Sequence, residues 1–107
     1  MFRRLTIGVI GDATVDRGSA NYILAENLGR ALIDHGYRIT NGGMSGIMEA
    51  VCKGAKSSPG YLEGMVIGIL PGFDPSFSNQ YVDVVILAGS GSVAFLFMGF
   101  PQFKIDI

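Results

Sequence analysis

Short β-branched runs that end at glycine and lead into helical patterns recur along this chain, and this alternation limits the folds open to it. The first run, RLTIGVI at residues 4–10, is bounded by Gly11 and Asp12, which is typical of a strand buried on both faces of a parallel sheet. YRIT, MVIGIL and YVDVVIL predict three more strands. Strands that alternate with helices indicate right-handed βαβ units. The expected fold is therefore α/β, with a mainly parallel sheet and flanking helices.

Two helices are expected between the first three strands. The first follows Ser19, a residue type favoured at N-caps, and carries Leu24, Leu28 and Leu32 at four-residue spacing as its apolar stripe. The second, at residues 46–56, has apolar side chains on nearly every side. Such a helix is expected to be covered by other elements or by a partner subunit.

The apolar stretch at residues 84–103 carries no charge and is about long enough to cross a bilayer. Because glycines interrupt it, we expect a strand, a turn and a short helix at residues 92–100 instead of a membrane span. The aromatic and aliphatic side chains of that helix exceed what one helix can turn inward, which predicts an exposed patch and a homo-oligomer, dimeric or higher. The alternative is that this segment completes the core of a monomer.

Composition excludes several classes of protein. With 107 residues, 49% hydrophobic and 16% charged, the chain is expected to be a single globular domain over residues 1–107. A net charge of -1 with scattered basic residues provides no footprint for nucleic acid. One cysteine, Cys52, forms no intrachain disulfide, and one histidine, His35, makes no zinc site without acidic partners. We therefore expect no metal site and a cytoplasmic location.

Glycines mark the loops where a ligand is expected. Open α/β sheets bind ligands beyond the carboxyl ends of their strands, and each loop predicted there contains glycine. In NGGMSG, at residues 41–46, Ser45 is the expected N-cap and Gly46 lies in the first helical turn. A glycine there costs about 1 kcal/mol relative to alanine, so it needs a reason: close approach of a ligand, or tight packing of the helix. The pattern predicts an anion at the helix that begins near Ser45.

Two carboxylates are candidates, both weak, for catalysis. Asp12 ends the first strand, a usual place for a ligand-binding carboxylate, although an Asx turn would use the same residue. Glu49 lies one turn into a buried helix, so it either faces the cleft in a catalytic or ribose-binding role or pairs with a basic side chain. Cys52 has no activating base in view and is expected in the core.

A second glycine motif follows the fourth strand. Residues 89–94, GSGSVA, match the G-x-G-x-x-A pattern of dinucleotide-binding loops, but the acidic residue expected about 20 positions later is not in this sequence. Gly89, Ser90 and Gly91 are nevertheless candidate binding residues, together with Gly72 on the preceding loop.

The order of these motifs resembles a known family. IGVIGDA, then LGRALIDHGYRITNGGMSGIMEAVCKGAK, then VIGILPGFDPSFSNQYVDVVI are similar to the molybdenum-cofactor carrier proteins and the cytokinin-activating phosphoribohydrolases (Lonely-guy proteins), once labelled lysine decarboxylases. The resemblance runs from about residue 5 to residue 86, and its most specific part is NGG-x-x-G-x-M at residues 41–48. It implies a Rossmann-like fold whose glycine loops bind a nucleotide or pterin phosphate. The residues on which this role falls are Gly11, Asp12, Ala13, Asn41, Gly42, Gly43, Met44, Ser45 and Gly46.

The chain departs from the family after its fourth strand. The resemblance implies a later P-G-G-x-G-T-x-x-E element that supplies the catalytic glutamate. If LAGSGSVAF is placed there, Phe95 stands at the glutamate; in the placement that we prefer, on the preceding segment, Ala94 stands where an arginine belongs. Either way a residue needed for hydrolysis is missing. We expect the N-terminal portion of the fold, with its second half incomplete.

These observations favour a carrier-like protein that binds a phosphate-bearing small ligand, with a nucleotide or molybdopterin as the expected ligand and none bound covalently. One alternative is a phosphoribohydrolase acting on nucleoside 5'-monophosphates; the other is a non-catalytic association subunit or remnant. The residues leave open whether the chain is an enzyme. They argue against a pyridoxal-dependent lysine decarboxylase, since Lys53, Lys56 and Lys104 lie in no convincing pocket.

Overall fold

The protein folds into one parallel sheet with two α-helices, seen in a computed structural model that describes residues 5–91 and 103–106. The elements in chain order are β1 (Thr6–Ile10), α1 (Ala20–Asp34), β2 (Arg38–Asn41), α2 (Ile47–Lys56), β3 (Val66–Leu70), the 3-10 turn η1 (Pro75–Phe77), β4 (Val84–Leu87) and β5 (Phe103–Asp106). The strand order is β4-β3-β2-β1-β5. The predicted α/β, Rossmann-like fold is confirmed.

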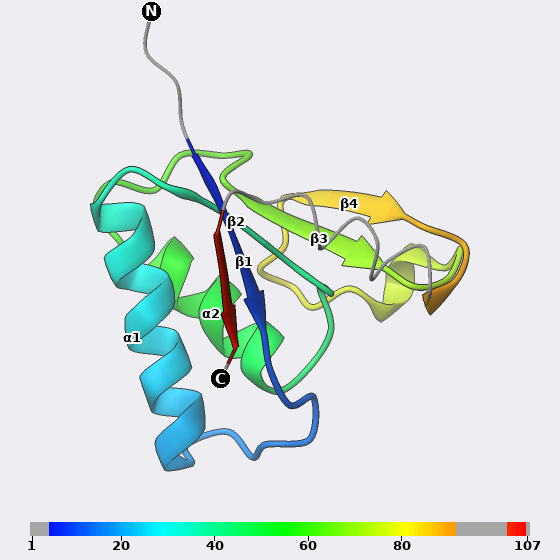
Figure 1. The fold of residues 1–107 in the computed structure, drawn as a ribbon, viewed down its shortest axis with the longest axis horizontal. Helices are drawn as coiled ribbons and strands as arrows, with labels where there is room; N and C mark the ends of the chain where they lie inside the picture. The colour runs from blue at the N-terminus through cyan, green and yellow to red at the C-terminus, as the bar shows by residue number, and fades with distance from the viewer. Residues whose placement is uncertain (1–4, 92–102, 107) are drawn as a thin grey trace, which may run out of the picture.

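The sheet runs in one direction from β1 to β3, and this places both helices on one face. All four strand pairings are parallel, and Ile39 of β2 lies between Ile7 of β1 and Val66 of β3 in the register. Because successive right-handed crossovers step the same way along the sheet, α1 and α2 cover the same side. Figure 1 shows the two helices packed next to each other, with β3 and β4 reaching beyond them at the right.

The buried face of helix α1 matches the expected leucine stripe only in part. Ser19 is its N-cap as predicted, with its Oγ accepting a hydrogen bond from Tyr22 N at 3.3 Å. Of the predicted leucine stripe, Leu28 and Leu32 pack partly buried against the core, whereas Leu24 is 57% exposed. The buried residues are Tyr22, Ala25, Gly29 and Ile33. Small side chains at the middle of this stripe allow α1 to approach α2 much more closely than leucines would.

Two glycines bring the helix backbones into contact. A Cβ added to Gly29 would lie 2.0 Å from the carbonyl oxygen of Val51 in α2. A Cβ added to Gly54 of α2 would lie 1.7 Å from the carbonyl oxygen of Glu26 in α1. Real Cβ atoms do not approach backbone oxygens so closely, so any side chain at either position has to push the helices apart.

Helix α2 is the centre of the core, as its apolar pattern predicts. Eight of its residues are buried, and Ala50, Val51, Cys52 and Ala55 are fully enclosed. They pack with β1, β2 and the start of β3 in one cluster. The β4 edge of the sheet is less covered, because the four side chains of this edge strand are 36–41% exposed.

The last part of the chain holds one strand that was not expected and one predicted helix that the structure does not describe. Strand β5 was not predicted: residues 103–106 pair in parallel with β1, on the side opposite β2. The helix expected at residues 92–100, and with it the apolar patch that predicts a homo-oligomer, falls outside the described residues. Self-association stays a prediction that light scattering can test. In the described part of the chain, no helix has the length and apolarity needed to cross a membrane.

Candidate binding site at the carboxyl edge of the sheet

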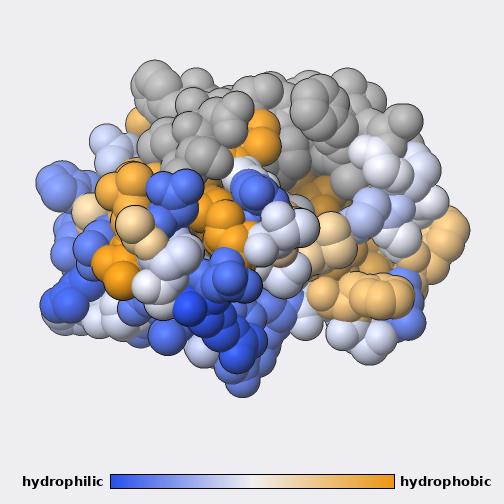
Figure 2. Space-filling model, turned by 90° about the horizontal axis from the view of Figure 1, so that it is seen from below, coloured by the Kyte–Doolittle hydropathy of each residue, from blue (hydrophilic) through white to orange (hydrophobic). Residues whose placement is uncertain are grey.

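The loops that follow β1, β2, β3 and β4 lie at one edge of the sheet, since all four strands are parallel. Figure 2 views the molecule from the side on which β1 ends. Blue residues gather at the left margin and lower centre of this face with orange patches among them, and pale orange covers much of its right-hand end, where β3 and β4 lie. Polar and apolar surface are therefore mixed along this edge, and apolar surface is prominent where β3 and β4 lie.

The side chain of Asn41 holds the loop after β2 in place. This side chain is fully buried; its Oδ1 accepts a hydrogen bond from Gly43 N at 2.8 Å, and its Nδ2 donates to Met48 O at 3.4 Å. Gly43 has φ +73°, and a Cβ there would lie 3.1 Å from Cα of Gly68 in β3. The turn is thus bound to its own strand, to the next strand and to the helix that follows. Hydrogen bonds and close packing therefore hold the turn on three sides.

Gly46, not Ser45, is the N-cap of α2, which corrects the expected start of the helix by one residue. Gly46 has φ +67°, and a Cβ on it would lie 2.3 Å from the carbonyl oxygen of Asp12. That same oxygen accepts the hydrogen bond of Ile47 N at 3.0 Å. Of the two reasons considered for glycine at this position, the geometry supports packing, because the loop after β1 fills the space where a side chain would go.

Ser45 is exposed beside this junction and joins the first two loops. Its Oγ donates a hydrogen bond to Ala13 O at 2.9 Å. Asn79, from the segment between β3 and β4, joins the second loop to the third: its Nδ2 donates to Gly43 O at 3.1 Å and to Met44 O at 2.8 Å. Three segments far apart in the sequence are therefore fastened together along the edge.

Glu49 pairs with a basic residue and does not face the cleft alone. Its side chain is 10% exposed, and its two carboxylate oxygens accept hydrogen bonds from Arg17 Nε at 2.9 Å and Nη2 at 2.8 Å. Tyr22 Oη also donates to it at 2.8 Å. Arg17, followed by Tyr22, lowers the pKa of Glu49 although burial acts in the opposite direction. The carboxylate stays ionised, and the ion pair fixes the loop after β1 onto the first turn of α2.

Asp12 forms the Asx turn that was one of its two interpretations. Its Oδ1 accepts hydrogen bonds from Thr14 Oγ1 at 2.6 Å and from Thr14 N at 2.7 Å, and these bonds lower its pKa. Asp12 and Asp16 border a hollow of about 340 Å³ near the N-terminus of α1. Two carboxylates make this hollow a poor place for a phosphate. A ligand role for Asp12 stays a prediction.

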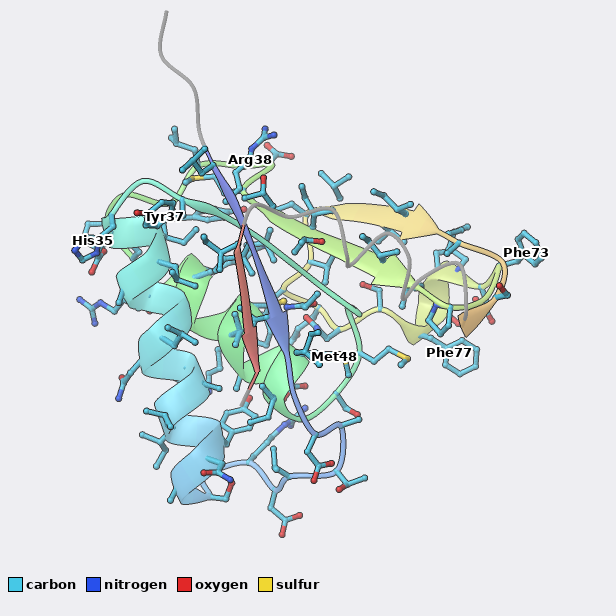
Figure 3. All side chains as sticks on the ribbon, in the orientation of Figure 1. His35, Tyr37, Arg38, Met48, Phe73 and Phe77 are labelled. Carbon is cyan, nitrogen blue, oxygen red and sulfur yellow. The ribbon has the colours of Figure 1, made fainter. Side chains whose placement is uncertain are left out.

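A second hollow, of about 330 Å³, lies on the other side of the glycine turn. It is lined by Met44, Leu70, Pro71, Gly72, Asp74 and Phe77. Phe77 is 69% exposed and Phe73 is 78% exposed, although large aromatic side chains are usually covered. Figure 3 shows both rings at the outer end of the β3–β4 region. Phe73 lies against Gly89 instead of lining the hollow, since a Cβ on Gly89 would be 2.7 Å from its ring.

The remaining predicted residues extend the same edge. Gly89 N donates to Gly72 O at 3.2 Å, which puts the loop of Gly89, Ser90 and Gly91 directly beside the loop after β3. That places it beyond the second hollow and far along the strand order from Asp12. The structure therefore brings together the first three predicted loops, with the fourth at one end.

Positive charge is scarce at this edge. Among the described side chains, Arg17 is the one cation on a loop that follows a strand; Arg30 lies within α1, Arg38 begins β2, and both lysines of α2 lie in its last turn. His35 closes α1 at the opposite end of the molecule, near Tyr37 and Arg38 in Figure 3. The described residues contain no cluster of three or more potential metal ligands.

Comparison with known proteins places the chain in a family. The profile of the SLOG cluster4 family matches residues 4–94. The chain belongs to the SLOG cluster4 family. An uncharacterised protein of Archaeoglobus fulgidus that it resembles is 36% identical over 87 residues, which make up 81% of this chain and 53% of that protein. The chain thus spans about half the length of this curated relative.

Solved structures similar to this SLOG cluster4 chain include two proteins of molybdenum cofactor metabolism. The molybdenum cofactor carrier protein of Chlamydomonas reinhardtii is 35% identical, with a TM-score of 0.71 over 84% of this chain and 53% of that one. The molybdenum cofactor binding protein of the phototrophic bacterium Rippkaea orientalis is 26% identical, with a TM-score of 0.81 over 100% of this chain and 65% of that one. The resemblance to molybdenum-cofactor carrier proteins noted from the motifs is confirmed.

Sequence reasoning missed three residues of the edge. Asn79 lies in a stretch that reads as a long turn, and no local pattern shows that its amide reaches back 36 residues to Gly43. Arg17 was assigned to a loop, although the unexplained charge of Glu49 was a signal that a cation must be near. Phe77 was passed over because one aromatic residue in a loop has no periodicity to test.

Proposed function

We propose that this chain binds a phosphate-bearing heterocyclic ligand at the carboxyl edge of its sheet, with the molybdenum cofactor as the leading candidate. The observation that carries the proposal is the fixed glycine turn of residues 42–46 beside an apolar hollow of about 330 Å³. Two structural neighbours are a carrier protein and a binding protein of this cofactor, which supports the choice.

The residues of the edge fit such a ligand in two parts. A phosphate suits the N-terminal end of α2, where the helix dipole is positive and the exposed Ser45 hydroxyl would exchange its hydrogen bond to Ala13 O for one to the phosphate. The Arg17 guanidinium reaches the first turn of the same helix and adds the one cation found on these loops among the described residues. The heterocyclic ring suits the hollow at Met44 and Phe77. The ligand would be cargo that is held and released without reaction.

Hydrolysis of nucleoside monophosphates is the weaker alternative. A general acid needs a carboxyl group whose pKa is raised toward neutrality. Among the described residues, every carboxyl group with a resolved pKa shift (Asp12, Glu49, Asp74 and Asp83) is shifted downward. We therefore expect no release of ribose 5-phosphate from AMP above background.

A pair of matched substitutions tests the phosphate position. Ser45→Asp places a negative charge at the N-terminal end of α2, where it favours the helix but repels a phosphate. Ser57→Asp places the same charge at the C-cap of the same helix, where it disfavours the helix and lies far from the ligand. Each protein is incubated anaerobically with molybdenum cofactor and passed through gel filtration, and the retained pterin is measured by fluorescence after oxidation.

We expect wild type and Ser57→Asp to retain the pterin and Ser45→Asp to lose at least about nine-tenths of it, equivalent to about 1.4 kcal/mol or more. Thermal melts check that Ser45→Asp remains folded. Retention by Ser45→Asp equal to that of wild type would show that no phosphate lies at α2.

A further inference from the structure

The hollow beside the glycine turn has features that select a particular ring edge. Its walls are mainly apolar, with Met44, Leu70 and Pro71 on the inner side and Phe77 on the loop between β3 and β4. One charged side chain, Asp74, stands at its border. A volume of about 330 Å³ lies near the lower limit of small-molecule sites and suits a bicyclic ring better than a complete nucleotide.

Phe77 lies where its ring can stack on a flat ligand. It ends η1, whose N-cap is Asp74, and its side chain is 69% exposed. An exposed aromatic ring at the border of an apolar hollow provides a face for a heterocycle, and stacking of this kind accepts any flat base. Stacking therefore explains affinity for a ring but does not choose among rings.

Asp74 is the side chain of the hollow that can distinguish one ring from another. Its Oδ1 accepts a hydrogen bond from Ser76 N at 2.9 Å, and hydrogen bonds from Ser76 keep the pKa of its carboxyl group below the usual value. An ionised carboxylate only accepts hydrogen bonds, and it accepts two parallel N–H groups best. A ring that places an amino group next to a ring N–H, as pterin and guanine do, matches this acceptor pair. Adenine and lumazine lack that donor pair.

We propose that the hollow formed by Met44, Leu70, Pro71, Asp74 and Phe77 is a ring subsite selective for the amino-oxo-pyrimidine edge shared by pterin and guanine. This inference rests on the proposed function, because it assigns the ring of the phosphate-bearing ligand. Phe77 stacks on the ring, and Asp74 accepts from its amino group and ring N–H. Phosphate contacts at Ser45 are separate from this subsite.

Phosphate-free probes test the ring subsite independently. Binding of pterin and of lumazine, which differ only in whether the pyrimidine ring carries an amino group or a second oxo group, is followed by their fluorescence. Guanosine and adenosine form the second pair and are followed by calorimetry. We expect pterin to bind at least about tenfold more tightly than lumazine, and guanosine more tightly than adenosine, since unpaired polar groups penalise the mismatched ring.

Three variants assign the effect to residues. Phe77→Ala should weaken pterin and lumazine alike by about tenfold, since both rings lose the stacking partner. Asp74→Asn keeps a good cap for η1 but removes the second carboxylate oxygen and the charge, so it should weaken pterin about tenfold and leave lumazine unchanged. Phe73→Ala is the matched control: it removes an equally exposed phenylalanine from the same segment, and we expect no change in affinity.

Each result either supports or overturns the inference. Tighter binding of pterin than of lumazine, and of guanosine than of adenosine, supports the shared edge, and equal binding of guanosine and adenosine overturns it. Equal binding of pterin and lumazine by wild type overturns it, as does equal weakening by Phe73→Ala and Phe77→Ala. If pterin fails to bind while the molybdenum cofactor is retained in a Ser45-dependent way, the ring subsite is wrong but the proposed function stands. If the cofactor is not retained either, both fail.

Discussion

The helix-covered region (β1, β2, α1 and α2) and the β4 region (residues 71–91) are built on opposite principles. In the helix-covered region, Ile39, Val51 and Ala55 are 0% exposed, and two glycines allow the helices to touch backbone to backbone. In the β4 region, each side chain of β4 is 36–41% exposed, and two phenylalanines point outward. The comparison indicates that the helix-covered region carries most of the buried core, whereas the β4 region is the exposed part in which the ring subsite is proposed.

The largest expected effect comes from the crossing of the two helices. Gly54→Val should lower the free energy of unfolding by about 3 kcal/mol or more, because a Cβ at this position would lie 1.7 Å from the Glu26 carbonyl oxygen. Urea denaturation followed by circular dichroism measures the change. Gly60→Ala is the control, since the nearest atom to a Cβ there is an ordinary 3.5 Å away. A cost below about 1 kcal/mol for Gly54→Val would show that the helices can separate freely.

A smaller loss is expected where the two regions join. Asn79→Ala removes the side-chain amide that donates to Gly43 O and Met44 O, while Gly43 O keeps its hydrogen bond from the backbone N–H of residue 79 at 2.7 Å. We expect the free energy of unfolding to fall by about 1–2 kcal/mol, with weaker ligand binding as well. Gln80→Ala is the control, because it removes an exposed amide at the next position and should change neither quantity. Unaltered binding by Asn79→Ala would separate the β4 region from the glycine turn.

Acid should lower the free energy of unfolding, because each region contains a partly buried carboxylate. In the helix-covered region, Arg17 lowers the pKa of Glu49; near β4, burial raises the pKa of Asp83, but hydrogen bonds from Tyr61 and Lys56 outweigh it. Because the pKa is lower in the folded state, each group stabilises the fold above its unfolded value near 4, and this contribution is lost as the pH falls further.

Unfolding experiments between about pH 6 and pH 3 should therefore show stability falling with pH. Glu49→Gln and Asp83→Asn should each flatten part of that fall, whereas Glu63→Gln, at an exposed position, should not. A pH profile that is identical in wild type and in both buried-site variants would show that these carboxylates do not set acid stability.

The smallest expected effect on stability lies at the outer end of the β4 region. Phe77→Ala should change the free energy of unfolding by no more than about 0.5 kcal/mol, since its ring is already 69% exposed. The matched substitution in the helix-covered region is Ile39→Ala, which should cost about 2–5 kcal/mol because Ile39 is fully buried. A large loss for Phe77→Ala would remove the contrast between the two regions.

Periodicity and turn residues were sufficient to predict the helix-covered region from the sequence, including the parallel sheet, the Ser19 cap and the buried α2. They failed where contacts between distant segments decide the outcome. The leucines of α1 have regular spacing, but the close approach of Val51 O to Gly29 puts small residues at the centre of the helix contact and leaves Leu24 exposed. Gly46 suggested a ligand in the sequence, whereas Asp12 O occupies its neighbourhood in the fold. Nothing local in residues 103–106 indicates that they pair with β1.

The tie from Asn79 to the glycine turn has a further consequence. It fixes the distance between the N-terminal end of α2, where a phosphate is proposed, and the loop that carries Phe77, where a ring is proposed. Two weak contacts held at a fixed spacing act as a chelate: once one end of a ligand is bound, the other end meets its contact at a high effective concentration. A ligand of matching length gains from both, and a fragment with only one end dissociates quickly. By fixing this spacing, Asn79 would make the site select ligands by length as well as by chemistry.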